Sequence, residues 1–299
     1  MSNKQPVVVT GGSGFIGGHL TSRLLNEGYK VLVVDKDMYK HRVTENLRFA
    51  RCDISDVANL KAIASQANFP TDSIVFHLAA QSRVNPSFDD PLKSYKDNII
   101  GTANVLEIFC KNHNNRLVYA GSSSYYGGAM ANPYAFSKHL GEEMCQMYTH
   151  CHGVQTAIAR FFNVYGPGHV TAGSDATVVG IFERLYKANL PLTITGDGEQ
   201  RRDFIHVGDV AWALDKISQV QEPGACIYNV GVGTNYSINE LAKMFEGSKI
   251  EYISSRLGEA RTTLCTDHSA TVKLGWWPTV SLEKYVADFC DQVNTERET

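Results

Sequence analysis

The sequence predicts an α/β protein with a doubly wound parallel sheet, followed by a smaller C-terminal mixed α/β region. Short, continuously apolar segments alternate with segments of helical apolar spacing, as is typical of parallel strands covered by helices on both faces. A glycine-rich turn joins the first of these strands to the first helix. After Asn163, glycine and proline breaks become frequent and the apolar segments shorten, so we expect the architecture to change there.

The expected elements follow in chain order. Strands are expected at Pro6–Thr10, Lys30–Asp35, Leu47–Cys52, Ser73–Ala79 and Arg116–Ala120, and shorter ones at Leu192–Thr195 and Ile227–Val230. Helices are expected at Phe15–Asn26, from about Val57 to Ala67, and from Asn132 to Thr149, because apolar residues recur there every three or four positions. We expect residues 1–162 to form one domain and residues 163–299 mainly a second, with the chain crossing back to the first at about 203–230.

Composition excludes several classes of partner. The 299 residues carry a net charge of -3, which provides no basic field for a nucleic acid. No apolar run approaches the ~18 residues that span a bilayer. The seven cysteines are odd in number and form no CxxC pair, which fits a reducing compartment and gives no zinc signature. We therefore expect a cytoplasmic protein without a metal, nucleic-acid or membrane partner.

The glycine-rich turn is TGGSGFIG, Thr10–Gly17. Gly11, Gly14 and Gly17 are spaced by three residues, directly after a strand and at the start of a helix. Glycines allow the backbone to approach a pyrophosphate closely, and the helix N-terminus offers it unpaired N–H groups. Taken alone, such a turn can also be only a tight connection.

An acidic residue supports the dinucleotide interpretation. Asp35 ends the second strand, 24 residues after Gly11, where a carboxylate would accept hydrogen bonds from a ribose 2′-hydroxyl. The carboxylate would repel a 2′-phosphate, so NAD is favoured over NADP, although Lys36 weakens that preference. Asp53, after the third strand, is expected on the adenine side.

The segment SSSYYGGAMANPYAFSK, Ser122–Lys138, contains one tyrosine with a lysine four residues on. Tyr134 and Lys138 would share one face of a helix. A neighbouring ammonium lowers the pKa of a tyrosine from about 10, which would make Tyr134 a usable general base. The alternative is an incidental pair on a surface helix. Ser122–Ser124 follow the fifth strand, at the sheet edge where doubly wound folds bind ligands.

The motifs together resemble the extended short-chain dehydrogenase/reductase family, in its NAD-dependent sugar-nucleotide epimerase/dehydratase branch, which includes UDP-glucose 4-epimerase. The matching segments, in the family's order along nearly the whole chain, are TGGSGFIG, the DI of RCDISD, FHLAAQ, SSSYYG, PYAFSK, RFFNVYGPG, GDGEQRRDFIHVGDVA and RLGEA…LGWWP. The resemblance implies a Rossmann domain that binds NAD and a smaller C-terminal domain that binds the nucleotide sugar.

The resemblance also implies residue roles. Tyr134 is similar to the catalytic base, Lys138 to its partner, which also contacts the nicotinamide ribose, and Ser122 to the catalytic serine. The positions that match cofactor contacts are Gly11, Gly14, Phe15, Ile16, Gly17, Asp35, Lys36, Asp53, Ile54, Leu78, Ala79, Ala80, Gln81, Asn98, Tyr134 and Lys138. The positions that match substrate contacts are Ser122, Ser123, Asn163, Arg202 and Arg256. Arg201 makes the assignment of Arg202 ambiguous by one residue.

The reaction expected from the resemblance is 4-epimerisation of a nucleotide-diphosphate sugar, with a UDP-hexose favoured by the branch. Dehydratases of the family carry acidic residues just after the catalytic serine or threonine, and decarboxylases keep a glutamate there, whereas this chain has Ser123 and Ser124. A 4-keto reductase or dehydratase of the same family, and a non-catalytic NAD-binding regulatory protein, remain alternatives.

One departure from the family pattern is a short spacing. Tyr134 follows Tyr126 by only eight positions, where epimerases of the branch have a longer substrate loop. We therefore expect a more open sugar pocket. Relatives commonly form homodimers through two helices, which makes Val105, Cys110, Met144 and Met147 candidate interface residues.

Overall fold

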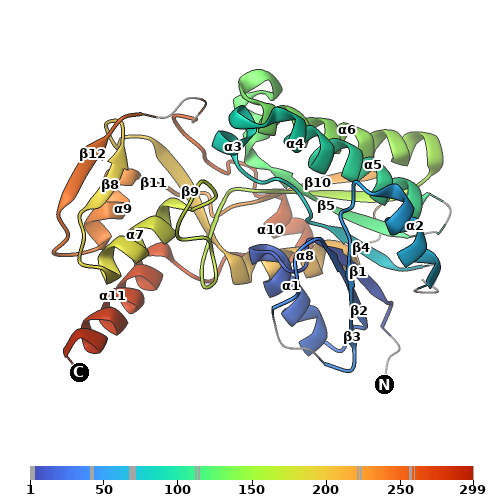
Figure 1. Cartoon of the computed structure of the whole chain (residues 1–299), viewed down its shortest axis with the longest axis horizontal. Helices are drawn as coiled ribbons and strands as arrows, with labels where there is room; N and C mark the ends of the chain where they lie inside the picture. Colours follow the sequence, from blue (N-terminus) through green and yellow to red (C-terminus); the bar gives the residue numbers. More distant parts are fainter. Residues whose placement is uncertain are drawn as a thin grey trace.

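The computed structural model describes residues 4–40, 44–66, 72–111, 113, 115–220, 222, 224–255, 258 and 260–298. Figure 1 shows a larger part, in which helices cover both faces of a sheet, and a smaller part formed by most of the yellow to red segments, a few of which return to the larger part. The predicted fold class is confirmed.

The large sheet has seven parallel strands in the order β10-β6-β5-β4-β1-β2-β3. Their bounds are β1 Val7–Thr10, β2 Val31–Asp35, β3 Leu47–Arg51, β4 Ile74–His77, β5 Arg116–Ser122, β6 Gln155–Phe161 and β10 Ala225–Val230. From β1 the chain builds β2 and β3 on one side and then returns to place β4 on the other. The edge between β1 and β4 is therefore a topological switch point, where doubly wound sheets bind ligands.

Helices cover both faces of this sheet. They include α1 Phe15–Asn26, α2 Val57–Gln66, α3 Val84–Asp89, α4 Pro91–Tyr95, α5 Gly101–Val105, α6 Pro133–His152, α8 Val207–Gln219 and α10 Ser269–Leu274, with π-helical turns at Lys96–Ile100 and Leu106–Cys110. Successive residues of β1 pack on opposite faces: Val9 joins a core with Leu20 of α1, and Val8 joins a core with Leu106. This alternation follows from the two-residue period of a strand.

The smaller part has its own core. It contains β7 Asn163–Tyr165, α7 Val178–Lys187, β8 Leu192–Thr195, β9 Arg201–His206, β11 Asn235–Ser237, α9 Ile238–Met244, β12 Ile250–Ile253 and α11 Leu282–Glu298. Its strands form the sheets β11-β9-β7 and β12-β8. Between β9 and β11 the chain returns to the large sheet, because β10 extends that sheet beside β6 and α8 packs against α1.

His77 is a buried titratable group at the switch point, at the end of β4. Thr10 Oγ1 lies 2.7 Å from Nδ1 and Thr102 Oγ1 lies 2.9 Å from Nε2. The Thr102 hydroxyl donates to the Asn98 carbonyl, so it accepts from His77, which is then the neutral Nε2–H tautomer. Burial, assisted by the charge of Lys138, lowers the pKa of His77 to about 3.

This lowered pKa predicts acid sensitivity. An unfolded histidine titrates near pH 6.5, so between pH 6.5 and 3 the unfolded chain binds a proton that the folded chain does not. Lowering the pH from 7 to 5 should therefore remove about 2 kcal/mol of the unfolding free energy through His77 alone. Chemical denaturation at pH 7 and pH 5 measures how much the unfolding free energy falls between the two pH values. In His77→Gln this fall should be smaller than in the unchanged protein by about 2 kcal/mol. An equal decrease in both proteins would contradict the assignment.

Candidate active site

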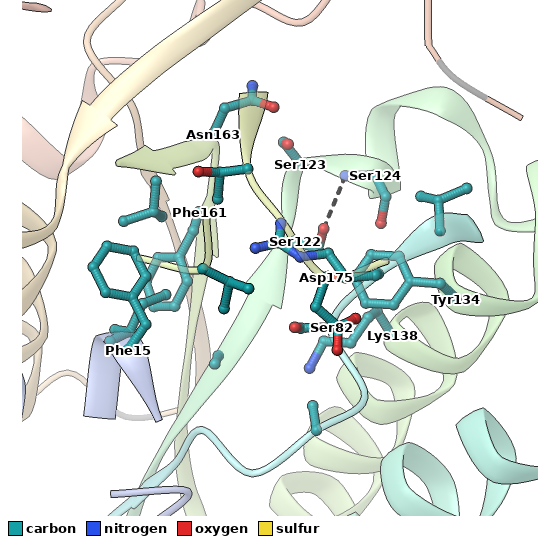
Figure 2. A pocket seen from close by; sticks show the side chains of 18 of the residues that line it. Phe15, Ser82, Ser122, Ser123, Ser124, Tyr134, Lys138, Phe161, Asn163 and Asp175 are labelled. Carbon is teal, nitrogen blue, oxygen red and sulfur yellow. Dashed lines mark hydrogen bonds between the residues drawn. The ribbon is translucent and has the colours of Figure 1, made fainter. Parts of the chain in front are cut away.

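One cavity of about 1200 Å³ runs from the ends of the parallel strands into the smaller part. The end of each of β1, β2, β4 and β5 contributes to its wall, as do α6, β9 and the segment between β7 and α7. Figure 2 shows the lining side chains around the end of β5. A single small ligand occupies about 300–1,000 Å³, so this volume suits a dinucleotide together with a second ligand.

The glycine turn forms a cradle at one end of the cavity. Gly11 has a φ of +76°, and a Cβ there would lie 2.5 Å from the backbone nitrogen of Ala79. A Cβ on Gly17 would lie 2.1 Å from the Gly11 carbonyl oxygen. Gly14 is the N-cap of α1 and provides no capping side chain, so the first amides of α1 are available to an anion. Phe15, Ile16, Leu78, Ala79 and Ala80 also line this end.

The carboxylate of Asp35 is held in place at the end of β2. Its Oδ2 accepts a hydrogen bond from the Ser13 amide at 2.9 Å, and its Oδ1 accepts one from the Asp37 amide at 3.0 Å. Lys36 Nζ lies 3.0 Å from Asp97 Oδ2, so a carboxylate already pairs with its charge. The favourable attraction of Lys36 for a 2′-phosphate is thereby reduced. Asp53 and Ile54 line the cavity beside Asp35 and Lys36.

Two predicted cofactor positions lie behind the lining. Asn98 Oδ1 accepts from the Gln81 amide at 2.7 Å, and Asn98 Nδ2 donates to the Gln81 carbonyl at 2.9 Å and to Ser137 Oγ at 2.8 Å. Neither Asn98 nor Gln81 is among the described residues that line the cavity. Asn98 thus fixes the chain after β4 against α6.

Tyr134 and Lys138 line the cavity from the first turns of α6. Asn132 is the N-cap of α6 and accepts from the Ala135 amide at 2.8 Å, and Pro133 begins the helix. Ser122 ends β5, and its Oγ accepts from the Ser124 amide at 3.1 Å, as the dashed line in Figure 2 shows. The structure therefore brings the serine, tyrosine and lysine to one surface.

The expected lowering of the Tyr134 pKa by Lys138 is wrong for this structure. Burial raises the pKa of Tyr134, and the opposing influences come from Ser122 and Arg83. Burial also lowers the pKa of Lys138 to about 8, although Glu142 opposes this effect. The Lys138 ammonium lies 4.1 Å from the centroid of the Tyr119 ring. Desolvation thus outweighs the attraction that a helical i, i+4 spacing suggests.

The second end of the cavity lies in the smaller part. Asn163 Nδ2 donates to the Asp203 carbonyl and to Thr263 Oγ1, both at 3.0 Å. Arg202 lines the cavity, whereas Arg201 pairs with Glu240 at 2.9 Å and with Asn235. Ser123 also lines the cavity. Arg256 lies outside the described residues.

Comparison with known proteins identifies the family. Residues 7–231 match the model of the NAD dependent epimerase/dehydratase family. The chain belongs to this family.

Relatives match over almost the whole chain. A putative UDP-glucose 4-epimerase of Methanocaldococcus jannaschii is 33% identical over 93% of this chain and 95% of its own length. A UDP-glucuronate 4-epimerase of Thermodesulfobacterium geofontis is 32% identical over 93% and 92%. The structure of a UDP-glucose 4-epimerase of Thermotoga maritima with UDP-glucose has a TM-score of 0.87 at 28% identity, and the match covers 98% of this chain and 100% of that chain.

The cofactor of this NAD-dependent epimerase/dehydratase family member is NAD. The uncapped amides of α1 fit the pyrophosphate, and the fixed carboxylate of Asp35 fits a ribose that has both hydroxyls. Two residues of the site were missed from sequence. Arg83 and Asp175 both line the cavity, but neither belongs to a motif that sequence reasoning used.

Asp35→Ala should weaken NAD binding by about 10- to 100-fold, because a carboxylate that accepts hydrogen bonds from ribose hydroxyls is lost. The preference for NAD over NADP should fall as well, since the repulsion of the 2′-phosphate is removed. Calorimetric titration of cofactor-free protein would measure both. Asp56→Asn, an exposed carboxylate that is not part of the cavity lining, is the matched control. Unchanged NAD affinity in Asp35→Ala would contradict the assignment.

Proposed function

We propose that this protein interconverts the C4 epimers of a nucleotide-diphosphate hexose, favouring a UDP-hexose, through a 4-keto intermediate. The observation that carries the proposal is the common surface of Ser122, Tyr134 and Lys138 in a cavity that also contains the dinucleotide cradle. Both relatives described above are 4-epimerases by name. Their names differ in the sugar, glucose in one and glucuronate in the other.

Each of the three side chains has a proposed task. Tyr134 Oη removes the proton of the C4 hydroxyl, and the Ser122 hydroxyl hydrogen-bonds the same oxygen. NAD, when bound in the cradle, would supply the acceptor for the C4 hydride and the donor that returns it to the other face of the keto sugar. Tyr134 then returns the proton to the C4 oxygen, so the cycle is redox-neutral and requires no external reductant. Lys138 provides positive charge beside the phenol and hydrogen-bonds the nicotinamide ribose.

The remaining contacts are assigned from the position of each residue in the cavity. The cradle around Gly11 and Gly17 holds the pyrophosphate, and Asp35 holds the adenosine ribose. Arg202 holds the diphosphate of the sugar nucleotide, because a planar guanidinium binds phosphate bidentately. Asn163, whose two Nδ2 hydrogens are donated to Asp203 and Thr263, shapes the cavity wall beside it. Lys138 and Tyr134 lie near the nicotinamide, and Asn98 acts through the backbone of Gln81.

Three alternatives to an epimerase differ in what they require. A 4-keto reductase would need NADH supplied stoichiometrically, whereas the epimerase works with the NAD it carries. A dehydratase needs an additional acid and base, which Ser123 and Ser124 do not supply. Asp175, by contrast, does bring a carboxylate into the cavity. A non-catalytic regulatory protein would bind NAD without turning over any sugar nucleotide.

We also propose a homodimer formed through α4, α5 and α6, which lie together on one face in Figure 1. Val105 and Cys110, candidate interface residues from sequence, are buried in the protomer core and are excluded from that role. Met147 is exposed and stays a candidate, Met144 is partly buried against the same core, and the exposed Leu92 is added to the proposed interface. In the described part of the chain, every helix is too short or too polar to cross a membrane. The cytoplasmic location stays a prediction.

Tyr134→Phe should lower the epimerisation rate by about 10²- to 10⁴-fold while NAD remains bound, because only the general base is lost. The assay incubates the protein with UDP-glucose, UDP-galactose and their N-acetyl and uronic forms without added reductant. Tyr125→Phe is the matched control, since Tyr125 packs its ring 3.4 Å from the Arg160 guanidinium and is not part of the cavity lining. A Tyr134→Phe protein that keeps NAD and most of its activity would overturn the mechanism.

A further inference from the structure

Arg83 is a partly buried cation whose guanidinium has no hydrogen bond or ion pair among the described residues. Arg83 lies between β4 and α3, as the N-cap of α3, and lines the cavity. Its Nε is buried and has no hydrogen-bond partner in the described part of the chain. No described carboxylate lies within 4 Å of its guanidinium. A guanidinium desolvated in this way is costly unless an anion or acceptor completes its hydrogen bonds.

The position of Arg83 separates it from the diphosphate. Arg83 is the N-cap of α3, and Ser87 Oγ of this helix accepts a hydrogen bond from the Tyr134 amide at 3.1 Å, so the start of α3 packs against the first turn of α6. Arg83 therefore faces the reacting end of the cavity. Asn163 and Arg202 come from β7 and β9 in the smaller part. In Figure 2, Ser122–Ser124 lie between Asn163 and the group of Tyr134, Lys138 and Asp175.

We propose that Arg83 binds the carboxylate of a hexuronic acid, so that the substrate is an acidic nucleotide sugar. The inference rests on the proposed 4-epimerisation, which places C4 of the sugar at Tyr134. The diphosphate is attached to C1, across the ring from C4, so it cannot reach an arginine at the C4 end. The carbon next to C4 is C5, and its substituent is a hydroxymethyl group in a hexose and a carboxylate in a uronic acid.

The carboxylate satisfies Arg83 better than a hydroxymethyl group does. A planar guanidinium donates two parallel hydrogen bonds to a carboxylate. A hydroxymethyl group offers one neutral acceptor and leaves the positive charge uncompensated. The negative charge of Asp175 disfavours the binding of a sugar carboxylate. Asp175 is exposed on the segment before α7, however, so water screens its charge. The positive charges of the partly buried Arg83 and the buried Lys138 therefore dominate the electrostatics at this end.

The test compares UDP-glucuronate with UDP-glucose. For the NAD-loaded full-length protein, both kcat/KM and equilibrium binding are measured for each sugar nucleotide. Arg83→Gln should lower the ratio of the two specificity constants by about 10- to 100-fold, and Arg83→Lys should recover part of it through charge alone. Asp175→Asn should raise the same ratio. Arg116→Gln is the matched control, because Arg116 is also partly buried with an orphan Nε but lies at the opposite end of β5.

Each outcome is decisive. Preferential use or binding of UDP-glucuronate, lost selectively in Arg83→Gln, supports the proposal. Turnover of UDP-glucose with no preference for the acid, or an equal loss for both sugars in Arg83→Gln, overturns it while the proposed epimerisation stands. If neither sugar is turned over but UDP-glucuronate binds more tightly through Arg83, the proposed reaction fails and the substrate class is retained.

Discussion

The buried ion pair between Glu142 and Arg160 holds the proposed catalytic surface together. Arg160 Nη2 lies 2.7 Å from Glu142 Oε2, and both side chains are almost fully removed from solvent. Glu142 is one helical turn after Lys138 on α6, while Arg160 belongs to β6. Breaking a buried pair by removing one partner typically costs about 3–5 kcal/mol, since the other charge is left uncompensated. The position of Lys138 relative to the sheet therefore depends on a contact that itself touches no ligand.

The same arginine explains how the chain tolerates its short segment between Tyr126 and Tyr134. Two 3₁₀ turns, Ser123–Gly127 and Ala129–Ala131, span this segment. The Arg160 guanidinium lies 3.4 Å from the centroid of the Tyr125 ring, and the Tyr126 hydroxyl donates to Asn229 of β10 at 2.7 Å. These contacts hold the turns against the sheet. Another wall of the cavity is formed by the segment between β7 and α7. His169 of this segment lies 2.8 Å from Glu183 of α7.

Sequence reasoning succeeds where the cause is local. Apolar strands, glycine spacing and the i, i+4 relation of Tyr134 and Lys138 are properties of neighbouring residues, and they suffice for the fold class and for one edge of the cavity. It fails where burial decides. The Tyr134 pKa, the core positions of Val105 and Cys110 and the orphan Nε of Arg83 all depend on segments far away in the sequence. The choice between Arg201 and Arg202 likewise depends on Asn235 and Glu240. Strand β6 was not foreseen, although it carries Arg160.

The charges around Tyr134 link specificity to catalysis. Burial raises the pKa of the phenol, which stays neutral, and lowers the pKa of Lys138 to about 8, so that Lys138 is still mostly protonated at pH 7 before a ligand enters. Arg83 opposes this effect at Tyr134 as long as its own charge is uncompensated. A carboxylate bound to Arg83 would hold the sugar in place and would also cancel that assistance. With an acidic sugar, the positive charge that stabilises the phenolate must then come from Lys138 and from the bound cofactor. Because Glu142 raises the pKa of Lys138 toward its ordinary value, the buried pair with Arg160 becomes part of what keeps Tyr134 usable as a base.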